Sequence, residues 1–247
     1  MLPCQCMGAG APLNLKISFN FAGKTAGLFV GGNMIVASVM KRNPVFVRPD
    51  VSLTDAKALM EKEKIGKLPV LDKNDRLVGL LTRKDLAKAS PSDATTLDIF
   101  EIGYLLSKLK VEKIMTKNVV SVQENEVVEE AARIMADNDV GCLPVMKGDL
   151  LVGIITESDL FREFVDMFGA RYNGVRITAI LNEKPGQLAK FTTYIAEAGG
   201  NIVSLVTSEA DDLTKRCCTC KVTGLTKEEV EEAFRKTGAE IEDVRVI

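Results

Sequence analysis

The 247-residue chain contains no histidine and no tryptophan, and only 5% of its residues are aromatic. Without histidine it cannot build Ser-His-Asp or Cys-His catalysis, and most catalytic zinc sites are excluded as well. It has no run of eighteen apolar residues, so we expect no helix that spans a membrane. It also lacks a stripe of Lys and Arg, and its net charge of −2 argues against a nucleic-acid partner.

What is present is typical of a soluble globular protein, with 46% hydrophobic and 27% charged residues. The six cysteines show no disulfide framework and indicate a reduced, cytoplasmic protein; they are Cys4, Cys6, Cys142, Cys217, Cys218 and Cys220. In a strand, Cys218 and Cys220 would face one side and Cys217 the other, so three thiolates could not converge on a metal ion. We therefore expect small buried strand residues here, no metal site and no catalytic cofactor.

The first 33 residues form an uncertain extension without sustained periodicity or the order of a signal peptide. The organised pattern begins at Met34, which favours a start site assigned too early. A genuine N-terminal arm is the alternative.

The main feature of the sequence is an internal repeat. Residues 39–70 align with 114–145 at an offset of 75, and the match resumes after a one-residue deletion at an offset of 74. Each copy reads β-α-β-β-α, with a short strand, a helix, a Leu-Pro-Val strand, a second strand and a second helix. One copy is too small to bury its apolar faces alone, so we expect the two to pack together with pseudo-twofold symmetry.

This pattern resembles the cystathionine-β-synthase (CBS) domain pair, or Bateman module. The residues that carry the resemblance are VMKRNPV (39–45) with IMTKNVV (114–120), the two Leu-Pro-Val strands, and GLLTRKD (79–85) with GIITESD (153–159). The connecting segment 90–115, with an amphipathic helix expected around Leu97–Leu109, is similar to the linker of the acetoin-utilisation regulatory (AcuB-like) family. That family joins a CBS pair to an ACT domain, and it suggests a role near acetoin or acetyl-group metabolism.

The C-terminal part, 175–247, has the β-α-β-β-α-β order of a ferredoxin-like domain and resembles an ACT domain through the loop NEKPGQ (182–187). The expected fold is thus α/β (α+β). The expected divisions are an extension (1–33), CBS domain one (34–89), a linker helix (90–110), CBS domain two (111–170) and an ACT domain (174–247).

The strongest functional signal is a glycine, two hydrophobic residues, a threonine and an aspartate three positions later, present in both copies. Gly79 and Gly153 would let a ligand approach the backbone, and Thr82 and Thr156 would stand at helix N-termini that favour anions. The resemblance implies that these positions, with Asp85 and Asp159 on the ribose, bind an adenine nucleotide. The same spacing is also a capping box, which would stabilise each helix without a ligand.

The two clefts differ in charge. Lys67, Arg83 and Lys84 bring positive charge to the first copy, whereas the second has Cys142 and Glu157 at the positions of Lys67 and Arg83. We therefore expect the cleft built on Thr82 and Asp85 to favour nucleotides with more phosphates.

In the ACT-like part, the resemblance implies that Asn182, Pro185, Gly186 and Gln187 form a loop that can hold an amino acid. Dimerisation by sheet pairing alone is the interpretation we favour.

These observations predict a non-catalytic regulatory protein, not an enzyme. Its ligand would be an adenine nucleotide (AMP, ADP, ATP) or S-adenosylmethionine, and it would form a homodimer or higher homo-oligomer that acts on an effector protein. The alternative is a CBS/ACT dimerisation scaffold for a partner enzyme, with no small-molecule ligand.

Overall fold

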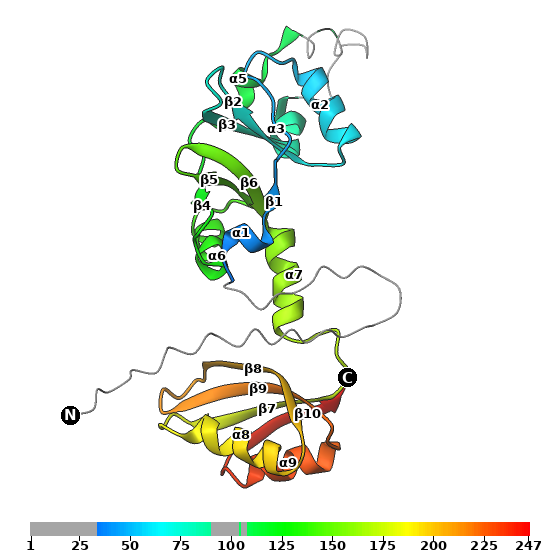
Figure 1. Cartoon of the computed structure of the whole chain (residues 1–247), viewed down its shortest axis with the longest axis vertical. Coiled ribbons are helices and arrows are strands. Elements are labelled where there is room, and N and C mark those ends of the chain that lie inside the picture. The colour runs from blue at the N-terminus through cyan, green and yellow to red at the C-terminus, as the bar shows by residue number, and fades with distance from the viewer. Residues whose placement is uncertain (1–33, 90–103, 105–107) are drawn as a thin grey trace, which may run out of the picture. The chain divides into compact units, whose positions relative to one another are not determined.

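The computed structural model describes residues 34–89, 104 and 108–247 (Figure 1). The expected linker helix around Leu97–Leu109 falls mostly outside these residues. The mixed α/β fold is confirmed: two copies of one unit are followed by a β-α-β-β-α-β domain. No helix in the described ranges is both long and apolar enough to cross a bilayer.

The first copy contains α1 (Val36–Val39), β1 (Lys41–Arg42), α2 (Leu53–Lys62), β2 (Lys67–Leu71), β3 (Leu77–Thr82) and α3 (Arg83–Ala89). The second contains α5 (Val111–Ile114), β4 (Val122–Gln123), α6 (Val128–Asp137), β5 (Cys142–Lys147), β6 (Leu150–Thr156) and α7 (Glu157–Met167). The strand expected at 45–47 is reduced to one parallel bridge between Val47 and Val70.

The leading segments of the two copies are exchanged. Strand β1 pairs antiparallel with β6, in a sheet of order β1-β6-β5-β4, and Val36 lies in the core of the second copy. In the opposite direction, Val111 of α5 is fully buried in the core of the first copy, and Thr116 bridges to Leu80 of β3. Each copy therefore completes its core with a segment that the repeat alignment assigns to the other.

The glycines of the repeated motif serve this exchange. A Cβ built on Gly79 would stand 2.3 Å from Met115 Sδ, and one built on Gly153 would stand 2.3 Å from Met40 Sδ. The space that a Cβ would take beside each glycine is filled by a methionine of an exchanged segment. Methionine packing is therefore a reason for these glycines that the sequence did not show, and the approach of a ligand to their backbone stays a prediction.

The C-terminal domain has one antiparallel sheet of order β10-β7-β9-β8 with two helices (Figure 1). Its elements are β7 (Val175–Asn182), α8 (Gln187–Glu197), β8 (Asn201–Glu209), β9 (Lys215–Thr223), α9 (Lys227–Arg235) and β10 (Glu240–Val246). Phe191 and Phe234 are fully buried with ring centroids 4.0 Å apart, which ties both helices to the sheet. Burying each ring contributes about 1.5–3 kcal/mol.

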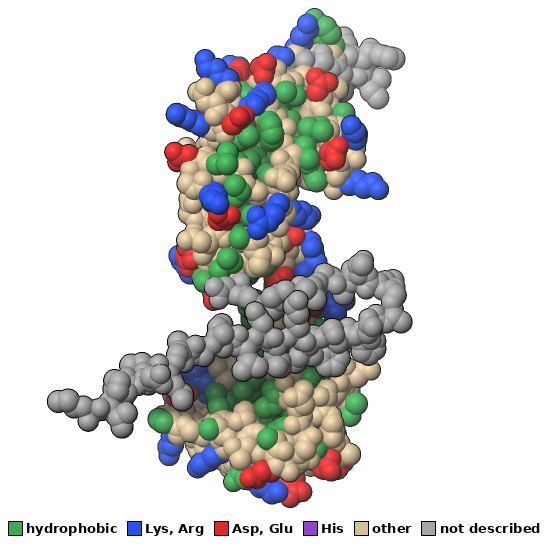
Figure 2. Space-filling view, viewed as in Figure 1, with side chains coloured by type: hydrophobic (Ala, Val, Ile, Leu, Met, Phe, Trp, Pro, Cys, Tyr) green, Lys and Arg blue, Asp and Glu red, His purple; other side chains and the backbone are tan. Residues whose placement is uncertain are grey.

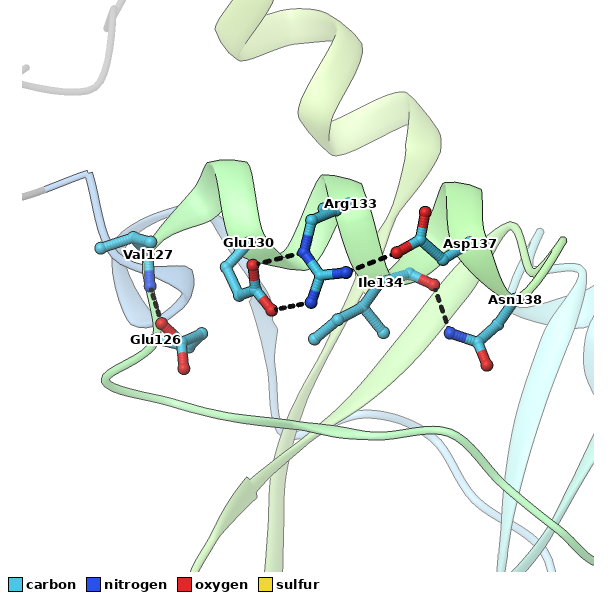
Figure 3. A network of polar contacts seen from close by, with 7 residues as sticks. All are labelled: Glu126, Val127, Glu130, Arg133, Ile134, Asp137 and Asn138. Carbon is cyan, nitrogen blue, oxygen red and sulfur yellow. Dashed lines mark hydrogen bonds and ion pairs between the residues drawn. The ribbon is translucent and has the colours of Figure 1, made fainter.

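Charges of both signs are interspersed on the surface of the repeats, as Figure 2 shows for one face. On α6, the Arg133 guanidinium donates to Glu130 at 2.6 and 2.8 Å and to Asp137 at 2.5 Å (Figure 3). The hydrogen bonds from Arg133 lower the pKa of the Glu130 carboxyl. This network fixes side chains along nearly the full length of α6.

Alanine at either glycine of the motif should destabilise the protein, because its Cβ would overlap the facing methionine. We expect Gly79→Ala and Gly153→Ala each to lower the free energy of unfolding by about 1–3 kcal/mol, measured by urea denaturation. Gly66→Ala is the control, since its nearest neighbour would be Arg83 Cδ at 3.6 Å. Equal stability of all three variants would contradict the packing role.

Candidate functional site

The two Thr-x-x-Asp sequences lie where a strand turns into a helix, at β3–α3 and β6–α7. In the first, Asp85 Oδ2 accepts from Thr82 N at 2.9 Å and from Thr82 Oγ1 at 2.7 Å. In the second, Asp159 Oδ2 accepts from Thr156 N at 2.9 Å and Thr156 Oγ1 at 2.5 Å. Both aspartates thus act as capping-box residues. The helix cap therefore uses one oxygen, Oδ2, of each carboxylate.

The remaining carboxylate oxygens differ. Asp159 is 2% exposed, and its Oδ1 accepts from Arg162 Nη2 at 2.8 Å. Asp85 is half-buried, and its Oδ1 has no hydrogen-bond partner among the described residues. The first copy therefore presents an open acceptor where the second presents an ion pair. Arg162 was missed from the sequence, although its spacing of three from Asp159 on a helix is a signal for such a pair.

The Lys67 side chain reaches from the first copy to the second. Its ammonium donates to the carbonyl of Gly141, at the start of β5 in the second copy. There it lies close to Cys142. Burial raises the pKa of the Cys142 thiol, and the nearby Lys67 ammonium offsets part of that rise. The Lys67 side chain thus crosses the junction between the copies, and its contact with a phosphate stays a prediction. Arg83 and Lys84 stay exposed on the first copy.

Equivalent helices of the two copies border two grooves of different character. The second copy has a groove of about 550 Å³, lined by Ala132, Met135, Ala136, Asp139, Val140, Gly141, Glu157, Leu160, Phe161 and Phe164. The first has one of about 390 Å³, lined by Lys57, Met60, Glu61, Arg83, Leu86 and Ala87. Of the expected nucleotide residues, Arg83 alone lines either groove. Lys57 and Glu61 correspond to Ala132 and Ala136, so these two positions are charged in the first groove and apolar in the second, where Asp139 and Glu157 are the charged lining residues.

The loop of the C-terminal domain borders a third cavity, of about 490 Å³, to which Asn182, Pro185, Gly186 and Gln187 all contribute. Gly186 has φ +85°, and a Cβ there would meet nothing within 4 Å, so the backbone is open to approach. The Gln187 side chain donates to Thr237 O at 3.3 Å, which gives it a structural partner.

Arg216 and Glu183 also line this cavity and form an ion pair with each other. The Glu183 carboxylate raises the pKa of Arg216. Sequence reasoning missed Arg216, because nothing in the sequence places the start of β9 beside the loop; the sheet register, with Arg216 opposite Leu181, does so.

The cysteines of β9 follow the expected strand alternation. Cys218 and Cys220 are fully buried, and Cys217 is partly exposed. Burial raises the pKa of Cys218 to about 11 and that of Cys220 to about 12. Among the described residues, no group of three or more acidic or cysteine side chains has the arrangement of a metal site.

Two pseudo-symmetric β-α-β-β-α units with exchanged leading segments, followed by a ferredoxin-like domain, define a tandem CBS protein with an ACT-like domain. The model of the CBS domain matches residues 36–92 and 111–166, and that of the TTHA0829-like ACT domain matches residues 173–245. The chain belongs to the CBS-domain family and carries a CBS pair followed by a TTHA0829-like ACT domain.

The chain is similar to an uncharacterised 17.7 kDa protein of Acidianus ambivalens, with 32% identity over 151 residues, 59% of this chain and 85% of the relative. It is 32% identical over 135 residues to a homoserine O-acetyltransferase of Methanosalsum zhilinae, covering 53% of this chain but only 25% of the enzyme. The crystal structure of a putative acetoin utilization protein (AcuB) from Vibrio cholerae is 31% identical, covering 56% of this chain and 96% of that one, with a TM-score of 0.47. Because this score is below 0.5, the family assignment rests on the sequence matches.

Removing the two capping aspartates should destabilise the protein unequally. Asp159→Ala loses the cap and the Arg162 ion pair at a buried position, so we expect a loss of about 1–2 kcal/mol in the free energy of unfolding. Asp85→Ala, at a half-buried position without the ion pair, should lose less. Chemical denaturation without ligand measures both, and equal losses would show that the Arg162 pair is unimportant.

The thiols should react in the order of their exposure. At pH 8, Cys217 should react with iodoacetamide well before Cys218 and Cys220, because thiolate is the nucleophile and burial raises both of their pKa values above 10. Peptide mapping of the native protein over time resolves the three sites. Rapid modification of Cys220 would show that β9 is not packed as described.

Proposed function

We propose that this chain is a non-catalytic regulatory protein whose CBS pair binds an adenosine-containing ligand: AMP, ADP, ATP or S-adenosylmethionine. The observation that carries the proposal is the strand-to-helix junction of the first copy, where Asp85 keeps one oxygen open beside the exposed Arg83 and Lys84. A carboxylate can accept from the vicinal hydroxyls of a ribose, and two cations can pair with phosphate oxygens. The family membership supports this interpretation.

The first copy is the proposed high-affinity site, in keeping with the charge difference in the sequence. In the second copy a ribose would have to displace Arg162 from Asp159, and Glu157 would repel phosphate. Ligand binding then favours one of two arrangements of the protein. The size of this shift is set by the difference between the affinities of the two arrangements for the ligand. We propose that a homodimer or higher homo-oligomer presents this change to an effector protein in the reduced cytoplasm.

We do not propose acetyltransferase activity for this chain, because it spans only a quarter of the matched homoserine O-acetyltransferase. Resemblance to acetoin-utilisation regulators makes acetoin or acetyl-group metabolism the first pathway to test. The cavity beside Gly186 supports amino-acid binding by the ACT domain as a second ligand event, in which a ligand carboxylate would replace Glu183 as the partner of Arg216.

A ligand-free scaffold is the second candidate, and a specific surface favours it. Phe161 and Phe164 on α7 are 68% and 51% exposed beside the apolar groove of the second copy. Large exposed apolar side chains are typical of subunit interfaces. In this alternative the capping boxes serve the helices alone.

Thermal unfolding with adenosine, AMP, ADP, ATP and S-adenosylmethionine separates the two candidates. A ligand at 100 times its dissociation constant should stabilise the wild type by about 2.7 kcal/mol, and chromatography should recover it unchanged. Each variant is compared with its own ligand-free melting temperature. Asp85→Ala should lose the shift, and Asp159→Ala should largely keep it.

The exposed Asp50→Ala serves as the control and should respond like the wild type. No shift with any adenosine compound would favour the scaffold. A shift lost only in Asp159→Ala would overturn the assignment to the first copy.

A further inference from the structure

Lys221 of β9 is a buried cation that neither candidate site uses. It is 4% exposed, and no carboxylate pairs with it in the part of the chain that the structure describes. Its ammonium donates instead to Gly169 O at 2.8 Å and to Tyr172 O at 2.9 Å. A buried charge requires such partners, because an ammonium without them would be strongly unfavourable.

The residues that Lys221 holds directly follow α7. This helix ends at Met167, and Ser204 Oγ of β8 donates to Phe168 O at 3.1 Å. The carbonyls at a helix C-terminus carry partial negative charge, so a cation there is favourable. Strands β8 and β9 therefore bind three carbonyls just beyond the last turn of α7.

The backbone between α7 and β7 fits this contact closely. Gly169 has φ +58°, and a Cβ on it would stand 2.5 Å from Val203 Cγ1 of β8. A Cβ on Gly174 would stand 2.5 Å from Val222 O of β9. Both positions therefore require glycine for lack of space. Gly169 requires it also because its positive φ is a conformation that other residues rarely adopt. The sequence 168–174 is thus shaped to lie on these two strands.

We infer that Lys221 is a positioning residue that couples α7 to the ACT sheet, so that ligand binding at the CBS pair is transmitted through α7 to β8 and β9. The transmission of ligand binding rests on the proposed function. The contact between Lys221 and the segment after α7 does not. Helix α7 begins beside Gly141, whose carbonyl accepts from Glu157 N and from Lys67 of the first copy. The carbonyls that Lys221 binds follow the last turn of the same helix. Release would hydrate both the ammonium and the carbonyls, so the contact can open without leaving a buried charge unpaired.

Hydrogen exchange measured by mass spectrometry tests the contact on the ligand-free full chain. Lys221→Met keeps the length of the side chain and removes its donors. We expect the amides of Ala170, Tyr172 and Gly174 to exchange about tenfold faster or more in this variant. Lys215→Met, on the same strand with a more exposed side chain, is the control and should leave these amides unchanged.

If Lys221→Met fails to fold, Gly169→Ala disturbs the same contact from the other side without replacing a residue of the sheet, because its Cβ would press on Val203 of β8. It should accelerate the same amides. Unchanged exchange in both folded variants would overturn the contact. In the wild type, an adenosine compound that raises the melting temperature should also change exchange in β8 and β9. Lys221→Met should still bind the compound but lose that change.

These outcomes separate the two proposals. A ligand that binds without altering β8 or β9 in the wild type overturns the coupling and leaves the sensor intact. If no adenosine compound binds, the sensor and the transmission of its ligand both fail, while the ligand-free comparison still decides whether Lys221 holds the segment after α7.

Discussion

The exchange of leading segments between the two copies is the constraint on which the CBS pair depends. Met40 packs on Gly153 and Met115 on Gly79, while β1 completes the sheet of the second copy. Leu80, Cys142 and Ile154 form a small core cluster that contains residues of both copies. Because each core takes residues from the other half of the sequence, the pair is a single cooperative unit. A helix that starts at either junction, such as α7, therefore begins from a fixed point.

Duplication gave two junctions with the same capping geometry, and later substitutions made them different. Asp85 keeps an open oxygen, whereas Arg162 closes Asp159; the groove beside the first carries Lys57 and Glu61, whereas the second presents alanines and phenylalanines. The surface proposed for ligand binding and the surface proposed for a scaffold therefore lie on different copies of the module.

Much of the architecture could be predicted from the sequence, because the repeat and the alternation of strands are local patterns. The two β-α-β-β-α copies, the C-terminal β-α-β-β-α-β order and the alternation of Cys217 and Cys218 in β9 are of this kind. What could not be predicted depends on which distant residues meet. Nothing local shows that Met115 fills the space beside Gly79, that Lys67 reaches Gly141, or that Arg216 lies beside Glu183. The capping boxes were foreseen as an alternative, but the ion pair that distinguishes them was not.

The crossed arrangement has a consequence for the order in which the protein matures during translation. The core of the first copy includes Val111, so it cannot close until the ribosome has released the chain well beyond α3. Val36, by contrast, emerges early and must wait for Leu143 and Ile155 before it is covered. The core of the first copy can therefore close once α5 has emerged, whereas Val36 stays uncovered until the second copy is nearly complete.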